Sequence, residues 1–194
     1  MRHFLASAGG GRLRAGLSRA MAVFDDLKQG LPAVAGPDTR LLILGSLPGE
    51  VSLARRQYYG HPQNQFWRLM GEVLDEPLAP LAYEDRLARL GARGVGLWDV
   101  VARARRQGSL DAALREAEAN DLEAFVGGLP QLRAVGFNGG VSARIGQAAL
   151  AGQAGRLALI PLPSSSPAFA GMSFAAKAER WKALTGFARA PDTG

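Results

Sequence analysis

The sequence contains no cysteine, and this absence excludes several kinds of chemistry. Without a single thiol among 194 residues, the chain cannot form a disulfide, a cysteine nucleophile, a thiolate zinc site or a cysteine-ligated iron–sulfur cluster. Histidine is also scarce, because only His3 and His61 are present. Any reaction must therefore use oxygen and nitrogen groups.

Long apolar runs and lysine are scarce as well. No run of about 18 apolar residues occurs, so we expect no membrane span and a cytoplasmic protein. Lys and Arg together number 23 against 17 Asp and Glu, a net charge of 23 − 17 = +6, and only three of the basic residues are lysine. Arginine matches phosphate geometry, so the charge favours a nucleic-acid partner. A GC-rich genome produces the same enrichment in Arg, Ala and Gly.

The N-terminal residues differ in composition from the rest of the chain. Residues 1–37 hold five basic and two acidic residues, so they supply +3 of the total charge. A transit peptide, an extension upstream of a start at Met21 and a flexible basic arm all fit this composition. We assign residues 1–37 to a basic extension and residues 38–190 to one domain of ordinary size.

Apolar runs alternate with segments of helical spacing along the predicted domain. The runs predict four strands, over 40–44, 95–98, 133–137 and 157–160. Helical spacing predicts helices over 66–74, 83–90, 110–119, 122–126, 141–149 and 173–187. This alternation indicates an α/β fold, a three-layer αβα sandwich around a four-stranded, mainly parallel sheet.

Each predicted strand ends in a loop of small, amide, hydroxyl or proline residues. Ligands of such folds bind at the carboxyl ends of the strands, so we expect these loops to converge on a site. They contain no phosphate-binding or dinucleotide-binding glycine motif and no nucleophile elbow. A hydrolase triad would need His61 with Asp99, and no serine has a suitable context.

The segment from Tyr58 to Trp67 carries three kinds of aromatic residue close to a histidine, a proline and an amide. Phe66 and Trp67 suit the core at a helix start, with Asn64 as the helix cap. Tyr59 can either pack in the same core or stack on a nucleobase.

Three blocks, in order, resemble the uracil-DNA glycosylase superfamily. They are Gly45-x-x-Pro48-Gly49, Tyr59-Gly60-His61-Pro62-x-Asn64-x-Phe66-Trp67 and the segment from Leu162 to Ala168. The resemblance covers about residues 38–188 and is strongest to the hypoxanthine (deoxyinosine) DNA glycosylases, followed by the mismatch-specific uracil-DNA glycosylases. It implies no metal and no cofactor.

The resemblance assigns a role to each group of residues. Asn64 aligns with an amide implicated in catalysis, and we expect Asn138 to recognise or polarise the base. The base pocket would be formed by Gly45, Ser46, Tyr59, His61 and Asp99. The last block would contact DNA and fill the gap left by a flipped base, through Ser164, Ser165, Ser166, Pro167, Ala168 and Phe169, with Lys177 contacting a phosphate.

One departure from the family pattern affects catalysis. Leu47 stands in the first loop where related enzymes carry an asparagine or an aspartate, and leucine cannot orient water. We therefore expect Asn64 to take over that duty. No lysine lies in the candidate loops, so no Schiff-base lyase step is expected.

These features lead us to expect a monomeric, monofunctional DNA glycosylase in a bacterial cytoplasm, acting on nucleoid DNA that contains deaminated bases. Hypoxanthine is the favoured base and uracil the second. A hydrolase of free nucleosides or nucleotides would keep the base pocket but not need the serine loop. A non-catalytic nucleic-acid-binding module is the other alternative, which Leu47 makes conceivable.

Overall fold

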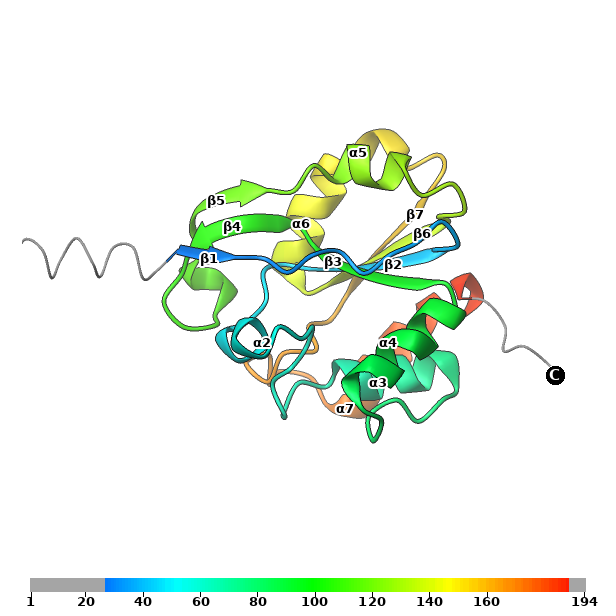
Figure 1. Cartoon of the computed structure of the whole chain (residues 1–194), viewed down its shortest axis with the longest axis horizontal. Helices are drawn as coiled ribbons and strands as arrows, with labels where there is room; N and C mark the ends of the chain where they lie inside the picture. Colours follow the sequence, from blue (N-terminus) through cyan, green and yellow to red (C-terminus); the bar gives the residue numbers. More distant parts are fainter. Residues whose placement is uncertain (1–26, 189–194) are drawn as a thin grey trace, which may run out of the picture.

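The computed structural model describes residues 27–188, so most of the predicted N-terminal extension and the last six residues lie outside it (Figure 1). In chain order the elements are β1 (Leu27–Gln29), β2 (Leu41–Gly45), α2 (Glu50–Arg55), α3 (Phe66–Leu74), α4 (Tyr83–Ala92), β3 (Val95–Asp99), β4 (Val101–Arg105), η1 (Asp111–Ala113), β5 (Arg115–Ala119), α5 (Leu122–Gly127), β6 (Ala134–Asn138), α6 (Gly140–Ala149), η2 (Ala151–Gln153), β7 (Ala158–Leu162), α7 (Phe174–Trp181) and η3 (Lys182–Phe187).

The centre of the fold is a four-stranded parallel sheet in the order β3-β2-β6-β7, as the apolar runs predict. All five residues of β2 are buried, because helices cover both faces of the sheet. Leu41 and Ile43 face one core, and Leu42 and Leu44 face the other. This alternation follows from the two-residue repeat of a strand.

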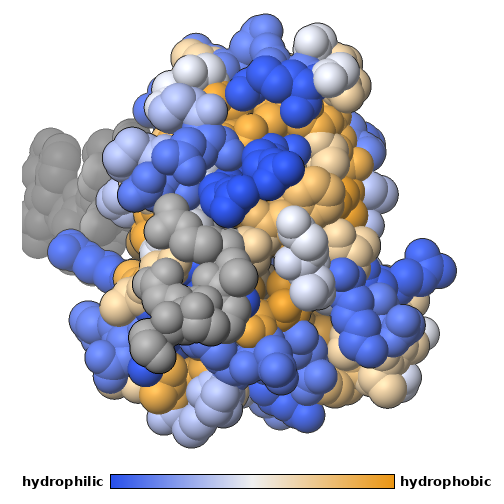
Figure 2. Space-filling model, turned by 90° about the vertical axis from the view of Figure 1, so that its right-hand side faces the viewer, coloured by the Kyte–Doolittle hydropathy of each residue, from blue (hydrophilic) through white to orange (hydrophobic). Residues whose placement is uncertain are grey.

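Helices form the two outer layers, so the predicted three-layer sandwich is confirmed. Helices α3, α4 and α7 gather below the sheet in Figure 1, and α5 and α6 lie above it. Trp181 and Phe66 are the largest fully buried side chains of the lower core, and Trp67 packs beside them. Figure 2 shows the face turned to the right of Figure 1, where a strip of hydrophobic residues lies between hydrophilic ones.

A second sheet corrects one expectation about secondary structure. The predicted helix over 110–119 is wrong, because these residues form η1 and the strand β5, which pairs antiparallel with β4. Alanine and charged residues favour a helix in isolation. Pairing with β4 overrides that preference, and ion pairs join the strands from Arg103 to Glu118 and from Arg105 to Glu116.

The third strand of this sheet lies within the stretch that the composition assigned to the extension. Strand β1 pairs antiparallel with β4, and Val34 forms a bridge with Leu97 of the central sheet. Paired structure is therefore already present at Leu27, ahead of residue 38. Charge alone could not reveal this, because strand pairing satisfies backbone groups whatever the side chains carry.

No helix within residues 27–188 is long and apolar enough to cross a membrane.

Two helical glycines make the packing of α6 testable. A Cβ on Gly146 would overlap Cε1 of Phe137, whereas one on Gly91 in α4 meets no atom within 4 Å. We expect Gly146→Ala to lower the free energy of unfolding by about 1–3 kcal/mol through overpacking. Gly91→Ala should raise it by up to about 1 kcal/mol, because alanine favours a helix. Denaturant unfolding measures both, and a stable Gly146→Ala protein would contradict the packing of α6 on β6.

Candidate active site

A cavity of about 760 Å³ opens at the carboxyl ends of the parallel strands. Loops after β2, β6 and β7 and the last residue of β3 contribute to its wall, as the strand-end rule predicts. Every site residue named from the sequence lines it except Lys177, namely Gly45, Ser46, Tyr59, His61, Asn64, Asp99, Asn138 and Ser164, Ser165, Ser166, Pro167, Ala168 and Phe169. The structure thus brings together three blocks that are far apart in sequence.

Gly45, the last residue of β2, makes room for two buried polar groups. A Cβ at this position would lie 2.7 Å from Oδ1 of Asp99 and 3.4 Å from the hydroxyl oxygen of Tyr59. Any side chain here would push Asp99 away. The glycine of the first block is therefore required by close packing at the bottom of the cavity.

Asp99 ends β3 and is only 3% exposed. Its Oδ2 atom has no hydrogen-bond partner among the described residues. Burial raises the pKa of Asp99 to about 7, and nearby Asp111 adds to the rise, while Tyr58 and Arg106 oppose it. The group is consequently a neutral carboxylic acid below about pH 7, able to donate a hydrogen bond.

Another aromatic ring covers one face of the Tyr59 ring, and the Tyr59 hydroxyl is buried. Its ring stacks on Phe66 with centroids 3.7 Å apart, so the predicted core role of Phe66 is confirmed and part of Tyr59 belongs to the same core. The Tyr59 hydroxyl is buried and forms no hydrogen bond of good geometry within residues 27–188. Burial and then Asp99 raise its pKa, while the nearby Asn138 side chain opposes the rise. The residue also lines the cavity and has a left-handed backbone with φ of 54°. Such conformations are costly and recur at functional sites.

His61 and Asn64 are oriented by local backbone donors. The Nδ1 atom of His61 accepts from the N–H of Gln63 at 3.2 Å, which leaves the proton of the neutral ring on Nε2. Oδ1 of Asn64 accepts from the N–H of Phe66 at 3.0 Å. The N-cap of α3 is Gln65, so the predicted cap at Asn64 is wrong by one position, although Asn64 still accepts from the first N–H of the helix. This backbone donor fixes which end of the Asn64 amide is oxygen.

Asn138, at the end of β6, is clamped by Ser165. Its Nδ2 donates to the Ser165 hydroxyl at 2.8 Å, and its Oδ1 accepts from the Ser165 N–H at 2.9 Å. One amide hydrogen and one oxygen lone pair of Asn138 remain for other partners. Both residues are buried, at 8% and 1% exposure. This pair links the predicted base-reading amide directly to the serine loop.

The serine loop presents an exposed edge, but Lys177 is not part of it. Pro167, Ala168 and Phe169 are exposed, and Phe169 retains 42% of its surface. Lys177 is 1% exposed, and its Nζ donates to Oε1 of Gln65 at 2.9 Å and to the Phe169 carbonyl at 3.0 Å. The expected phosphate contact of Lys177 is thus corrected to a buried tether, because the side chain is inaccessible and two of its three N–H donors are bound to these partners.

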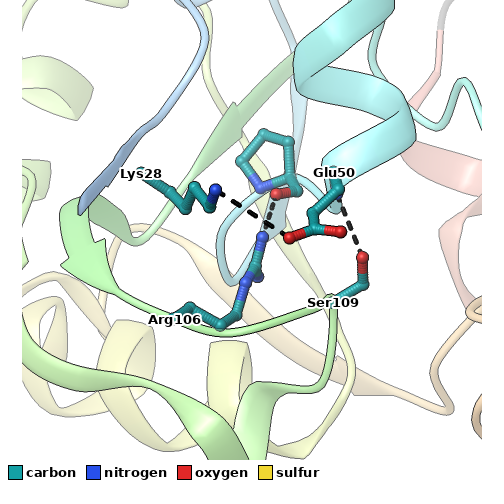
Figure 3. A network of polar contacts seen from close by, with 5 residues as sticks. Lys28, Glu50, Arg106 and Ser109 are labelled. Atoms are coloured by element: carbon teal, nitrogen blue, oxygen red, sulfur yellow. Dashed lines mark hydrogen bonds and ion pairs between the residues drawn. The ribbon is translucent and has the colours of Figure 1, made fainter. Parts of the chain in front are cut away.

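Arg106 does not line the cavity but holds its first loop, a role that the sequence did not reveal. Its guanidinium is buried and donates to the carbonyl oxygens of Leu47, at 3.0 Å, and Pro48. Figure 3 shows this arginine beneath the first loop, with Lys28 paired to Glu50 and Ser109 accepting from the Glu50 N–H. One arginine among twenty carries no local signal of such a role.

Leu47 itself is 5% exposed and packs in the core with Val100 and Val101. Ser46, beside it, donates to Oδ1 of Asp111 at 2.6 Å. The first loop is therefore held by a hydrophobic anchor, a buried arginine and a hydroxyl–carboxyl bond. No group of three or more potential metal-ligating side chains occurs within the part of the chain that the structure describes.

Comparison with known proteins agrees with this site. The sequence model of the Uracil DNA glycosylase superfamily matches residues 32–185, so the chain belongs to that superfamily. It is a DNA glycosylase, a hydrolase of N-glycosyl bonds.

Two relatives carry the name hypoxanthine DNA glycosylase. The Methanosarcina barkeri protein is 45% identical over 112 residues, which is 58% of this chain and 71% of its own length. The Methanosarcina acetivorans protein is 44% identical over 113 residues, or 58% and 72%. Both are archaeal, so they do not support the expected bacterial source.

A solution structure of a candidate uracil DNA glycosylase from Methanosarcina acetivorans has the same fold. It superposes with a TM-score of 0.73 at 38% identity, over 82% of this chain and 96% of that one.

The Arg106 contacts lead to a prediction about stability. Arg106→Met leaves the Leu47 and Pro48 carbonyls without their donor, so we expect a loss of about 3 kcal/mol in the free energy of unfolding. Arg103→Met removes an exposed arginine of the same strand region and should change little. Urea denaturation compares the two, and equal effects would show that the buried contacts contribute nothing.

Proposed function

We propose that the protein is a monofunctional glycosylase that removes deaminated bases from DNA, with hypoxanthine favoured and uracil second. The observation that carries this proposal is the single cavity that collects a stacking aromatic, two oriented amides, a buried carboxyl and an exposed serine loop. The names of the two relatives support hypoxanthine as the base. The cavity has room for a purine, since about 760 Å³ suits a small-molecule site.

The reaction requires a water molecule and an extruded nucleotide. Flipping the nucleotide costs least where the base is mispaired, which itself favours a deaminated base. Water adds its oxygen to C1′ of the deoxyribose as the C1′–N bond breaks, and the proton that the water releases replaces the one that Asp99 gives to the departing base. Asn64 directs this water through the lone pair of Oδ1 that the Phe66 N–H does not use.

Three groups recognise the base. It stacks on the face of Tyr59 opposite Phe66, while the remaining Nδ2 hydrogen of Asn138 points to an acceptor on its edge. Hypoxanthine has two neighbouring acceptors, O6 and N7. Asp99 in its neutral form donates to one of them, and a proton passed to N7 neutralises the leaving purine.

The serine loop meets the DNA backbone and the emptied stack. Ser164 and Ser166 are half-buried and offer hydroxyls, and the exposed Phe169 is the wedge that fills the gap. The only lysine near this loop, Lys177, is engaged by Gln65 and Phe169. A lysine Schiff base is therefore not part of the reaction, which makes the enzyme monofunctional.

Excision from defined oligonucleotides tests the proposal. Native protein, Asn64→Ala and Asn138→Ala are each incubated with duplex and single-stranded DNA containing hypoxanthine, uracil, xanthine or a thymine mismatch. We expect native excision to be fastest for hypoxanthine and next for uracil. Each substitution should lower single-turnover excision by about 10-fold or more, since an oriented amide is removed from the transition state.

The controls separate this enzyme from its alternatives. Gln131→Ala removes an exposed amide far from the cavity and should leave excision unchanged. Cleavage of free deoxyinosine without any action on an oligonucleotide would favour a nucleoside hydrolase. DNA binding by the native protein with no excision of any base would favour a non-catalytic module.

The pKa of Asp99 predicts how excision of hypoxanthine depends on pH. If its neutral form acts on the base, kcat/KM should be constant below about pH 6 and fall about 10-fold per unit above about pH 7. Asp99→Asn keeps a donor but cannot transfer a proton, so it should be slower and lack the fall. His61 also faces the cavity, and the fall should persist in His61→Gln; its disappearance there would contradict the assignment to Asp99.

Stability should follow the same titration with a defined sign. The folded-state pKa of Asp99 is raised above the ordinary value of 3.8. Its contribution to stability is therefore fully present below about pH 4 and is lost as the pH rises through 7. Asp99→Asn should consequently be less destabilising at pH 8 than at pH 5, as measured by thermal unfolding.

A further inference from the structure

A second hollow lies next to the active-site cavity, and one loop separates the two. It measures about 370 Å³ and shares Tyr59, His61 and Asn64 with the cavity. We call it the arginine groove, and its other lining residues are Arg55, Gln57, Gly60, Pro62, Trp67, Arg68, Ala79, Leu81, Ala82, Tyr83 and Arg86. The cavity and the groove are therefore adjacent, with these three shared side chains between them.

The charge of the groove differs from that of the cavity. Three arginines line the groove and no carboxylate does. The cavity contains Arg144 together with Glu50, Asp99 and Asp111. An anion is therefore favoured in the groove, whereas the cavity suits an uncharged base.

Each arginine is held by the protein in a way that leaves donors unused. Arg86 donates from Nε to the Leu81 carbonyl at 2.9 Å and from Nη2 to the Ala79 carbonyl at 2.7 Å, with its guanidinium over the Trp67 ring. Arg55 donates from Nη1 to the Gly60 carbonyl at 2.9 Å.

Arg68 completes the set from the first turn of α3. Its guanidinium lies 4.1 Å from the centre of the Phe174 ring and forms no ion pair within residues 27–188. A guanidinium has five N–H donors, so all three arginines retain several for a ligand. Because their positions are already constrained, little conformational entropy is lost on binding.

We propose that the arginine groove binds a phosphodiester group of the DNA strand that carries the excised base. Arginine binds phosphate oxygens through paired N–H donors, and three such side chains around one hollow match that chemistry. The groove would hold the lesion strand on the side of the loop opposite the flipped base, so that Tyr59 and Asn64 lie between the phosphate and the base. This inference rests on the proposed function.

A charge-matched pair of double variants tests the groove. Arg55→Gln/Arg68→Gln removes two of its arginines, whereas Arg56→Gln/Arg89→Gln removes two exposed arginines that do not line it. The probe is a duplex that contains one hypoxanthine. The protein concentration that gives half-maximal single-turnover excision is measured at several KCl concentrations. We expect the groove variant to require about 10-fold more protein. Its log–log salt slope should fall by about 1 for each phosphate that the variant no longer neutralises.

A second arm locates the phosphate. Single methylphosphonate linkages, which are uncharged, replace each phosphate flanking the hypoxanthine in turn. At one position the replacement should weaken DNA binding by the native and control proteins about 10-fold. The same replacement should not further weaken DNA binding by the groove variant. Equal effects of the two double variants, or additive effects at every position, would overturn the inference.

The two hypotheses fail in distinguishable ways. Lack of excision by the native protein would reject the proposed function. Salt slopes measured by binding of an unmodified duplex would then still report on the groove. Normal excision with identical half-saturation in both double variants would reject the groove alone. Arg86 is the better-anchored side chain, and Arg86→Lys keeps its charge but removes the guanidinium. If this variant folds normally and still binds the duplex more weakly, the weakening reflects the geometry of the guanidinium and not the charge alone.

Discussion

The parallel pairing of β2 with β3 and β6 is the constraint on which the site depends. In-register pairing places Gly45 beside Asp99 and brings the end of β6 to the same edge. Because β2 is buried along its full length, a shift of one residue would move its leucines to the opposite cores. The hydrophobic effect thus fixes the register, and the register fixes which polar side chains meet.

Burial of the polar groups at this edge of the sheet costs free energy, unlike burial of the apolar core around them. Asp99 Oδ2 and the Tyr59 hydroxyl are buried without hydrogen-bond partners in the described part of the chain, and an unsatisfied buried group costs about 1–3 kcal/mol. Gly45 permits both, and the Arg106 contacts to Leu47 and Pro48 hold the adjacent loop. A folded chain tolerates such groups where surrounding contacts over-determine the position, and active sites are where they are useful.

The clamp between Asn138 and Ser165 joins two parts that the sequence treats separately. An amide after β6 and a serine after β7 exchange two hydrogen bonds. Under the proposed function, this pair couples the base-reading amide to the loop that meets DNA. Lys177 supports the same loop from beneath, through the Phe169 carbonyl, and so acts as a structural residue where a surface contact was expected.

The sequence by itself determined the four-stranded parallel sheet and a set of site residues that all line the cavity except Lys177. Apolar runs and strand-end loops are local patterns, and they place residues at the same edge of a parallel sheet. Only the tertiary structure decided that 115–119 pairs as a strand, that Lys177 is buried and that Arg106 holds the first loop. These outcomes depend on partners distant in sequence, whose backbone pairing and desolvation outweigh local propensity and charge.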